Sequence, residues 1–232
     1  MSRKSILLGV AFIAAVLVFV GVTLGVLVKH EPSFYRRSAL PPGPIRSLHS
    51  EAFESETRML WSSLADRSPK WFATFTDAQI NSYFEEQLMR NRTYRDFLPK
   101  GASAPRVAIE SEKIRLAFRY GHGALSSVIS IDLRVWLAKN EPNVVCLELQ
   151  GLHAGALPIS AQSLLDQVTA ACQRKHIAVK WYRRNGNPVA LLRFQSEGSR
   201  PGVQLSNLEL RQGMLVLSGS CIQPGAISPS AN

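Results

Sequence analysis

The chain has 232 residues, which is enough for a membrane segment and one domain with a single core. Its 27 Lys and Arg exceed its 17 Asp and Glu, and the net charge is +10. Such a charge raises nucleic acid as a partner, but the basic residues are scattered and form no recognition helix or RNA-binding signature. We therefore expect no nucleic-acid partner, and assign the charge to a solvated surface or to attraction by anionic lipid headgroups.

Residues 6–28 contain no charged side chain. About 23 helical residues rising about 1.5 Å each reach roughly 35 Å, enough to cross a hydrocarbon core of about 30 Å. The segment is longer than the apolar region of a cleavable signal peptide, and it ends without an A-x-A pattern. No cysteine for a lipoprotein anchor precedes Cys146. The sequence therefore predicts an uncleaved signal-anchor over residues 1–30.

The side of the membrane on which the domain lies follows from the flanks of this anchor. Basic residues follow it, among them Lys29, Arg36 and Arg37, but long domains cross membranes largely regardless of charge. A very short basic N-terminus before a single anchor favours a domain on the outer face. Gly21 and Gly25 form a GxxxG pattern, which lets two membrane helices approach closely, so a homodimer through this seam is an open alternative.

Residues 31–48 include three prolines and Gly43 within four positions, and this composition predicts a spacer without regular structure. An α+β domain is expected over 49–222, opening with a helix over 49–66. A tail over 223–232, rich in Pro, Ser and Gly, is expected to be disordered.

A short aromatic strand over 71–75 leads into a second helix. Thr76 is its expected N-cap within a capping box. Asn81 lies beside the apolar stripe of this helix, and we expect it to make a polar contact with a strand. Glu85 and Glu86 are expected on the solvated face.

Beyond residue 106 the apolar residues alternate with polar ones, which is typical of strands with one buried face. A third helix, capped by Ser160 and continuing to about residue 175, interrupts the strands. Strands are expected over 114–120, 129–137, 144–150, 176–183, 188–194, 203–211 and 214–221. The order predicts an α+β fold in which a long antiparallel sheet packs on two or three helices.

The chain carries none of the familiar catalytic, nucleotide or calcium motifs. Its five histidines are isolated, and its three cysteines are widely separated without a CxxC pair. We therefore expect no enzyme activity, no cofactor, no metal, and cysteines that are mostly buried and free. Because triads form in space rather than in sequence, an unrecognised hydrolase stays an alternative. It would need His153 or His176 beside a serine and an acid within a cleft.

Three segments resemble a known family. The sequence TFTDAQINSYF resembles a helix start of YpmS-like membrane-anchored proteins. LELQGLHAGALPISAQSLLDQV resembles a strand-to-helix element of that family and of LmeA-like proteins, with Pro158 at the family proline, and VQLSNLELRQGMLVLSG is similar to their final hairpin. The resemblance, over 71–219, implies distant kinship with tubular lipid-binding (TULIP) proteins. In those proteins a long curled sheet wraps a helix and leaves an apolar groove.

By this resemblance, eight apolar side chains line the groove: Ile80, Phe84, Leu116, Phe118, Ile131, Leu133, Leu164 and Leu165. The same side chains would fill an ordinary core, and a sequence does not distinguish the two. The leading hypothesis is a membrane-anchored, non-enzymatic domain that binds lipid or an acyl chain, or assists envelope assembly. The alternative is a membrane-tethered scaffold that docks a protein on a sheet edge or on the Trp136 face.

Overall fold

The computed structural model describes residues 3–88, 98–99, 101–123, 126–174, 177–194 and 202–221, with side chains from Val16 onward. The tail expected over 223–232 lies outside these residues.

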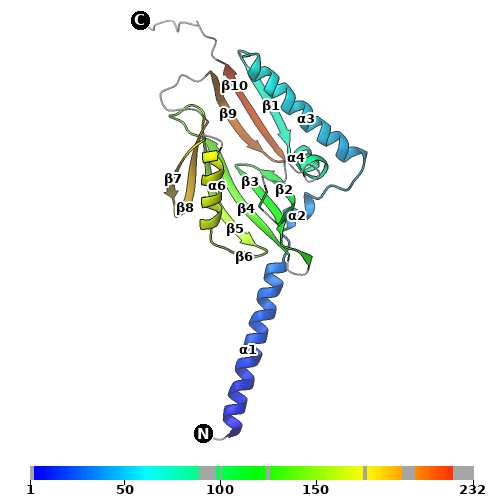
Figure 1. Cartoon of the computed structure of the whole chain (residues 1–232), viewed down its shortest axis with the longest axis vertical. Coiled ribbons are helices and arrows are strands. Elements are labelled where there is room, and N and C mark those ends of the chain that lie inside the picture. Colours follow the sequence, from blue (N-terminus) through cyan, green and yellow to red (C-terminus); the bar gives the residue numbers. More distant parts are fainter. Residues whose placement is uncertain are drawn as a thin grey trace.

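The first helix, α1 (Arg3–Lys29), projects from one end of the domain, with the N-terminus at its far end (Figure 1). Residues 16–26 are exposed along its whole circumference. Among the described residues, one helical stretch is long and apolar enough to span a membrane; it runs from Val16 of α1 to Arg37 at the end of α2.

The segment that follows α1 is not the spacer predicted from its prolines. Helix α2 (Ser33–Arg37) buries Phe34 and Tyr35, which are only 2 % and 1 % exposed, against the large sheet. Pro44 stands in the first turn of α3 (Pro44–Ala65), where a missing N–H costs no helical hydrogen bond. The prolines therefore limit irregular structure to a few residues, while the two aromatic side chains bind the segment to the domain.

The strands form two open antiparallel sheets, so the α+β prediction is confirmed, while the curl of the sheet stays a prediction. The smaller sheet has the order β1-β10-β9 and the larger has the order β2-β3-β4-β5-β8-β7, with β6 paired to β5. Their bounds are β1 (Trp71–Thr76), β2 (Ala102–Glu110), β3 (Lys113–Tyr120), β4 (Ser127–Leu137), β5 (Val144–Ala154), β6 (Leu157–Pro158), β7 (Ala178–Arg184), β8 (Asn187–Arg193), β9 (Val203–Arg211) and β10 (Met214–Cys221).

Helix α4 (Asp77–Tyr83) begins as predicted: the Thr76 hydroxyl accepts from the Gln79 N–H, and the Gln79 side chain accepts from the Thr76 N–H. The helix then widens into a π-helical turn, η1 (Phe84–Leu88). Glu85 and Glu86 on this turn do not form the solvated face expected for them. Glu86 pairs with Arg46 of α3 at 2.6 Å, and Glu85 lies 3.9 Å from Arg106 of β2.

Helix α3 packs on the smaller sheet and on α4 through Phe53, whose ring lies 5.3 Å from Phe75 and 4.7 Å from Tyr83. The remaining helix, α6 (Gln162–Arg174), covers part of one face of the larger sheet (Figure 1). The indole N–H of Trp181 on β7 donates to the Thr169 hydroxyl of α6 at 2.9 Å, and this bond fixes the helix over β7.

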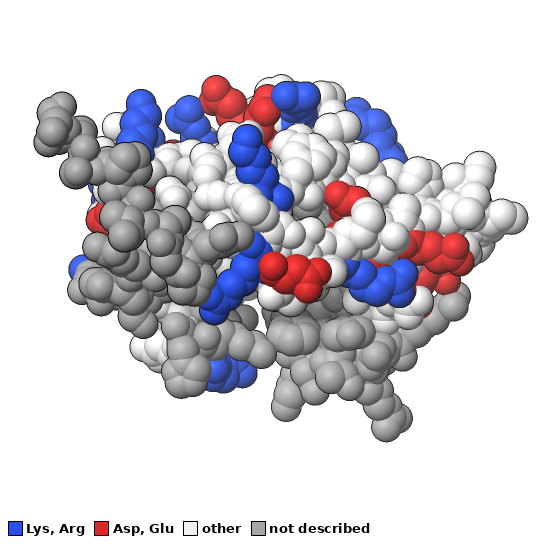
Figure 2. Space-filling view, turned by 90° about the horizontal axis from the view of Figure 1, so that it is seen from above, with Lys and Arg blue, Asp and Glu red and all other residues white. Residues whose placement is uncertain are grey.

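Figure 2 shows the end of the molecule opposite α1. On this face Lys and Arg side chains are interspersed with Asp and Glu. The charge visible there is mixed in sign and does not form one basic patch.

Candidate functional site

The larger sheet has one apolar face, which strand register defines. Residues directly opposite one another in antiparallel strands share a face. Leu116 pairs with Ile131, Phe118 with Ile129, and Leu133 with Leu149. Between Asp132 and Leu133 the register shifts, because β5 has an extra residue there. This bulge lets Leu149 and Leu152, three positions apart, point to the same face.

Six of the eight predicted groove residues meet on this face and on the helix above it. Ile131 is buried with Leu149 and Leu152, and the partly buried side chains packed around them are Leu116, Phe118, Ile129, Leu133, Ala161, Leu164 and Leu165. Ile80 and Phe84 are not part of this cluster. They lie on α4 and η1, which the amide of Asn81 holds at the edge of β2 rather than over the sheet face.

We call the partly covered part of this face the apolar shelf, defined by Leu116, Phe118, Ile129 and Leu133. Helix α6 reaches the cluster through Ala161, Leu164 and Leu165, yet each shelf residue keeps part of its surface exposed. The three cavities described for the chain lie elsewhere, along α1 and α2, on the outer face of α6, and between α2 and α4. Among the described residues, the shelf is an apolar surface that α6 covers in part.

The shelf begins next to the end of α1. The Ser127 hydroxyl, at the start of β4, donates to the Val28 carbonyl at 2.6 Å, and the Ala156 N–H donates to the Leu27 carbonyl at 2.8 Å. Lys29 Nζ donates to the Ser126 carbonyl at 2.9 Å. The Ser127 and Ala156 bonds satisfy carbonyls that a helix C-terminus leaves free. We call Ser126, Ser127, Gly155 and Ala156 the α1 seat.

Gly155 makes this close approach possible. A Cβ at this position would lie 2.3 Å from the Leu27 carbonyl oxygen and 2.4 Å from that of Val28, and the φ of Gly155 is +62°. Only glycine meets both demands without strain. Nothing in the composition or periodicity of the sequence marks this contact, because the partners are more than a hundred residues apart.

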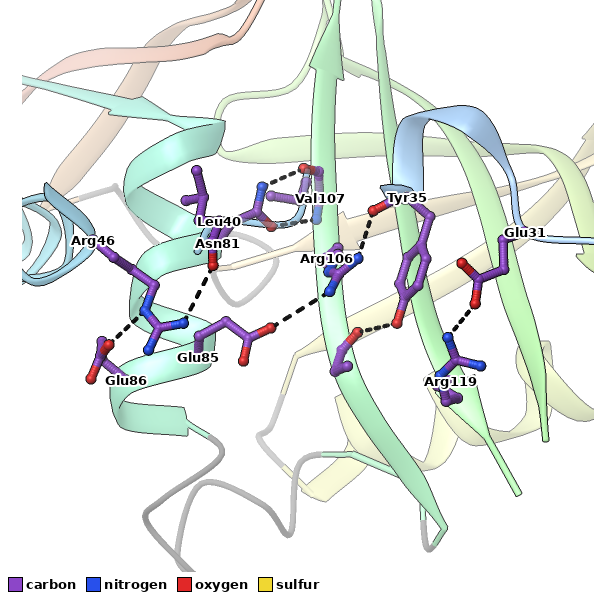
Figure 3. A network of polar contacts seen from close by, with 11 residues as sticks. Glu31, Tyr35, Leu40, Arg46, Asn81, Glu85, Glu86, Arg106, Val107 and Arg119 are labelled. Carbon is purple, nitrogen blue, oxygen red and sulfur yellow. Dashed lines mark hydrogen bonds and ion pairs between the residues drawn. The ribbon is translucent and has the colours of Figure 1, made fainter. Parts of the chain in front are cut away.

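The opposite face of the larger sheet receives α2 and combines buried apolar side chains, Ala117 and Val128, with arginines that contact the α2 segment (Figure 3). The Tyr35 hydroxyl donates to the Ala104 carbonyl at 2.9 Å, while its own carbonyl accepts from Arg106 at 2.8 Å. The Arg106 guanidinium also lies 4.3 Å from the centre of the Tyr35 ring. Burial raises the pKa of Tyr35, although Arg106 and Arg119 oppose the shift.

Two further arginines hold the entry to α2. Arg119 pairs with Glu31, and this hydrogen bond raises the pKa of Arg119 (Figure 3). Arg115 stacks on the Phe34 ring at 4.2 Å and donates to Asp132 at 3.0 Å. The segment from Glu31 through α2 is thus fixed to the domain by partly buried charge-assisted hydrogen bonds, which are stronger than neutral ones.

Of the two histidines named for a hydrolase, His176 lies outside the described residues, and around His153 the arrangement that a hydrolase would need is only partly present. Register places Ser130 opposite His153, and Asp132 lies on the same face of β4. Asp132, however, accepts from Arg115, and among the described residues no hydrogen bond joins Ser130, His153 and Asp132. Ser130 is also buried. A nucleophile and its base need mutual hydrogen-bond reach and access to substrate, so the arrangement is not a triad.

The cysteines are free and buried, as predicted for most of them. Burial raises the pKa of the Cys146 and Cys172 thiols, which makes them poor nucleophiles and poor ligands. Within the described ranges no three His, Cys, Asp or Glu side chains gather in a way that could hold a metal ion.

No family model, curated protein or solved structure matches this chain. The resemblance to YpmS-like and LmeA-like proteins therefore stays a prediction.

Proposed function

We propose that this protein is a membrane-anchored, non-enzymatic domain that binds a lipid through its acyl chain on the apolar shelf. In this proposal α1 spans the membrane as a signal-anchor and the domain lies on the outer face. In this proposal the larger sheet is curled, as in the tubular lipid-binding proteins that the sequence resembles, and the domain assists envelope assembly.

The observation that carries the proposal is the position of the shelf relative to α1. Ile129, at the near end of the shelf, is two residues from Ser127 of the α1 seat, and Leu133 continues the row away from it. If α1 spans the membrane, the partly exposed apolar side chains at the α1 end of the shelf would meet acyl chains at the bilayer surface. Each buried methylene of such a chain contributes about 0.8 kcal/mol.

The test is lipid retention by the full-length chain, extracted gently and examined by native mass spectrometry. Phe118→Gln removes a shelf side chain, and Phe72→Gln, on the smaller sheet, is the matched control because Phe72 is exposed and outside the shelf. Loss of about 1.5 to 3 kcal/mol of apolar contact predicts roughly tenfold or greater loss of bound lipid in Phe118→Gln only. Both variants must keep the wild-type melting temperature to within a few degrees.

Two results would overturn the proposal. One is a wild-type protein that carries no lipid and takes up none from mixed vesicles. The other is equal loss of lipid in both variants, which would point to nonspecific capture by exposed aromatic surface.

A second candidate function, a membrane-tethered protein scaffold, is favoured by the outer face of α3. Ile45, Leu48, Met59 and Trp61 are exposed on α3, with Ile45 at 71 % and Trp61 at 66 %. By helical spacing Ile45, Leu48 and Met59 share one side of the helix, and Trp61 lies on another. Exposed apolar side chains gathered on one element are typical of interaction surfaces. The sheet edge and the Trp136 face are weaker sites, because β7 carries Lys180 and two arginines, one of which lies 5.5 Å from the Trp136 ring.

Proximity labelling from the intact anchored chain tests this second function. A partner labelled by the wild type and lost in Trp61→Ser, with lipid binding unchanged, would support the scaffold. Identical labelling by the two proteins would exclude α3 as the docking face.

A further inference from the structure

An open surface recess of about 720 Å³ lies between the end of α1 and α2. Its lining residues are Val22, Gly25, Val26, Lys29, His30, Glu31 and Arg36. The four α1 residues are spaced three and four positions apart, so they form one face of the helix. A Cβ added at Gly25 would meet no atom within 4 Å, and the glycine therefore leaves room for a chain to lie against the helix.

The charge at the wide end of this recess is positive. Glu31 is the one acidic residue in its lining, and Arg119 already pairs with it. Lys29 donates to the Ser126 carbonyl. Arg36 is exposed, and its side chain makes no hydrogen bond or ion pair with any other residue in the described part of the chain. The apolar face of α1 thus leads to Arg36, which has no acidic partner among the described residues.

We propose that this recess binds one phospholipid with an anionic headgroup, whose phosphate contacts Arg36 and whose acyl chain lies along Val22, Gly25 and Val26. The inference depends on the part of the proposed function in which α1 spans a membrane, and it does not use the apolar shelf. Arginine suits a phosphate because its planar donors bind two oxygens at once.

A second copy of the chain is the competing occupant, because Gly21 and Gly25 of the GxxxG seam lie on the same helix face. Charge favours the lipid over the second copy. Pairing two α1 helices through this seam would bring together the Arg36 side chains of both copies, and like charges repel at the edge of a bilayer. An anionic headgroup neutralises the same side chain.

Arg36→Gln tests the recess, and Arg37→Gln is its matched control. Each variant removes one positive charge from an exposed arginine, but Arg37 lines a different cavity. The full-length protein is placed in phosphatidylcholine bilayers containing phosphatidylglycerol, and the enrichment of phosphatidylglycerol around it is measured with spin-labelled lipids. Loss of one basic contact near the surface predicts about a fivefold drop in enrichment for Arg36→Gln, while Arg37→Gln stays close to wild type. Equal drops would mean attraction by surface charge alone and would overturn the site.

Gly25→Leu and Gly21→Leu separate the lipid from the second copy. Gly25→Leu fills the recess, whereas Gly21 lies one turn deeper and does not line it. We expect Gly25→Leu alone to remove the enrichment. Conversion of a dimer to a monomer by either variant would assign the face to a second copy.

Competition by inorganic phosphate at millimolar concentration would assign Arg36 to a soluble anion and overturn the lipid site. Lipid loss from the shelf variant Phe118→Gln with normal enrichment here would leave this site standing independently.

Discussion

The side-chain amide of Asn81 pairs with both backbone groups of Val107, donating to its carbonyl and accepting from its N–H, each at 2.8 Å. Val107 lies on β2, the outer strand of the larger sheet, so the amide takes the place of a neighbouring strand. Asn143 does the same for β9 of the smaller sheet: it donates to the Val203 carbonyl at 2.6 Å and accepts from the Leu205 N–H at 2.7 Å. Two asparagines thus close two sheet edges against pairing with other chains.

Asn81→Ala should destabilise the domain by about 2 to 4 kcal/mol, because it leaves a buried N–H and a buried carbonyl of Val107 without partners. Asn207→Ala is the control, since Asn207 is exposed on β9. Chemical denaturation of the detergent-solubilised chain measures both. Equal stability of the two variants would mean that water replaces the amide at β2.

Gly219→Ala should destabilise the smaller sheet by about 1 to 3 kcal/mol through overpacking. A Cβ at Gly219 would lie 2.0 Å from the Gln204 carbonyl oxygen and 2.3 Å from the Trp71 ring. Gly202→Ala is the matched control, because a Cβ there meets no atom within 4 Å. The Trp71 fluorescence and the melting temperature should change for Gly219→Ala only. Unchanged values would show that β10 shifts to accept the methyl group.

Gly155→Ala should release α1 from its seat, since the added methyl overlaps the Leu27 and Val28 carbonyls. Gly186→Ala is the control for backbone strain alone. Gly186 also has a positive φ, +85°, but a Cβ added there would meet no atom within 4 Å. The measurement is the spread of distances between spin labels on α1 and on β5 in a bilayer. A broad distribution is expected for Gly155→Ala, and a narrow one for the wild type and Gly186→Ala. A narrow distribution in all three proteins would mean that other contacts hold α1.

Tyr35 should make the stability of the domain fall at alkaline pH. Burial raises the pKa of Tyr35 above the ordinary value of 10.0, so the folded chain keeps the phenol proton after the unfolded chain has lost it. The contribution of the protonated Tyr35 phenol to the free energy of unfolding is complete below pH 10.0. It is lost as the pH rises through the pKa of the folded state. Thermal melts below and above this pH should show a steeper decline for the wild type than for Tyr35→Phe. Parallel declines would assign the alkaline loss to other groups.

Local patterns in the sequence were sufficient to predict secondary-structure elements. The Thr76 capping box and the alternating strands over 114–120, 129–137 and 144–150 appear where they were predicted, because caps and amphipathic periods depend on neighbours in the chain. The polar role of Asn81 was predicted as well, although Val107 could not be named as its partner. Six of the predicted groove residues gather in one cluster: strand alternation assigns a face to the four on β3 and β4, and helical spacing does so for Leu164 and Leu165 on α6. Whether this cluster is a groove stays a prediction.

The α1 seat, the burial of Phe34 and Tyr35, and the ion pairs of Glu85 and Glu86 depended on contacts between distant segments. The prolines at 41–44 suggested a spacer, whereas the burial of two aromatic rings against the sheet outweighed the irregular backbone around them. The sequence by itself determined a helix long and apolar enough to cross a bilayer and a sheet with one apolar face, since both are periodic. Only the tertiary structure decided that helix and sheet are in direct contact, because a close approach at Gly155 depends on residues that meet after folding.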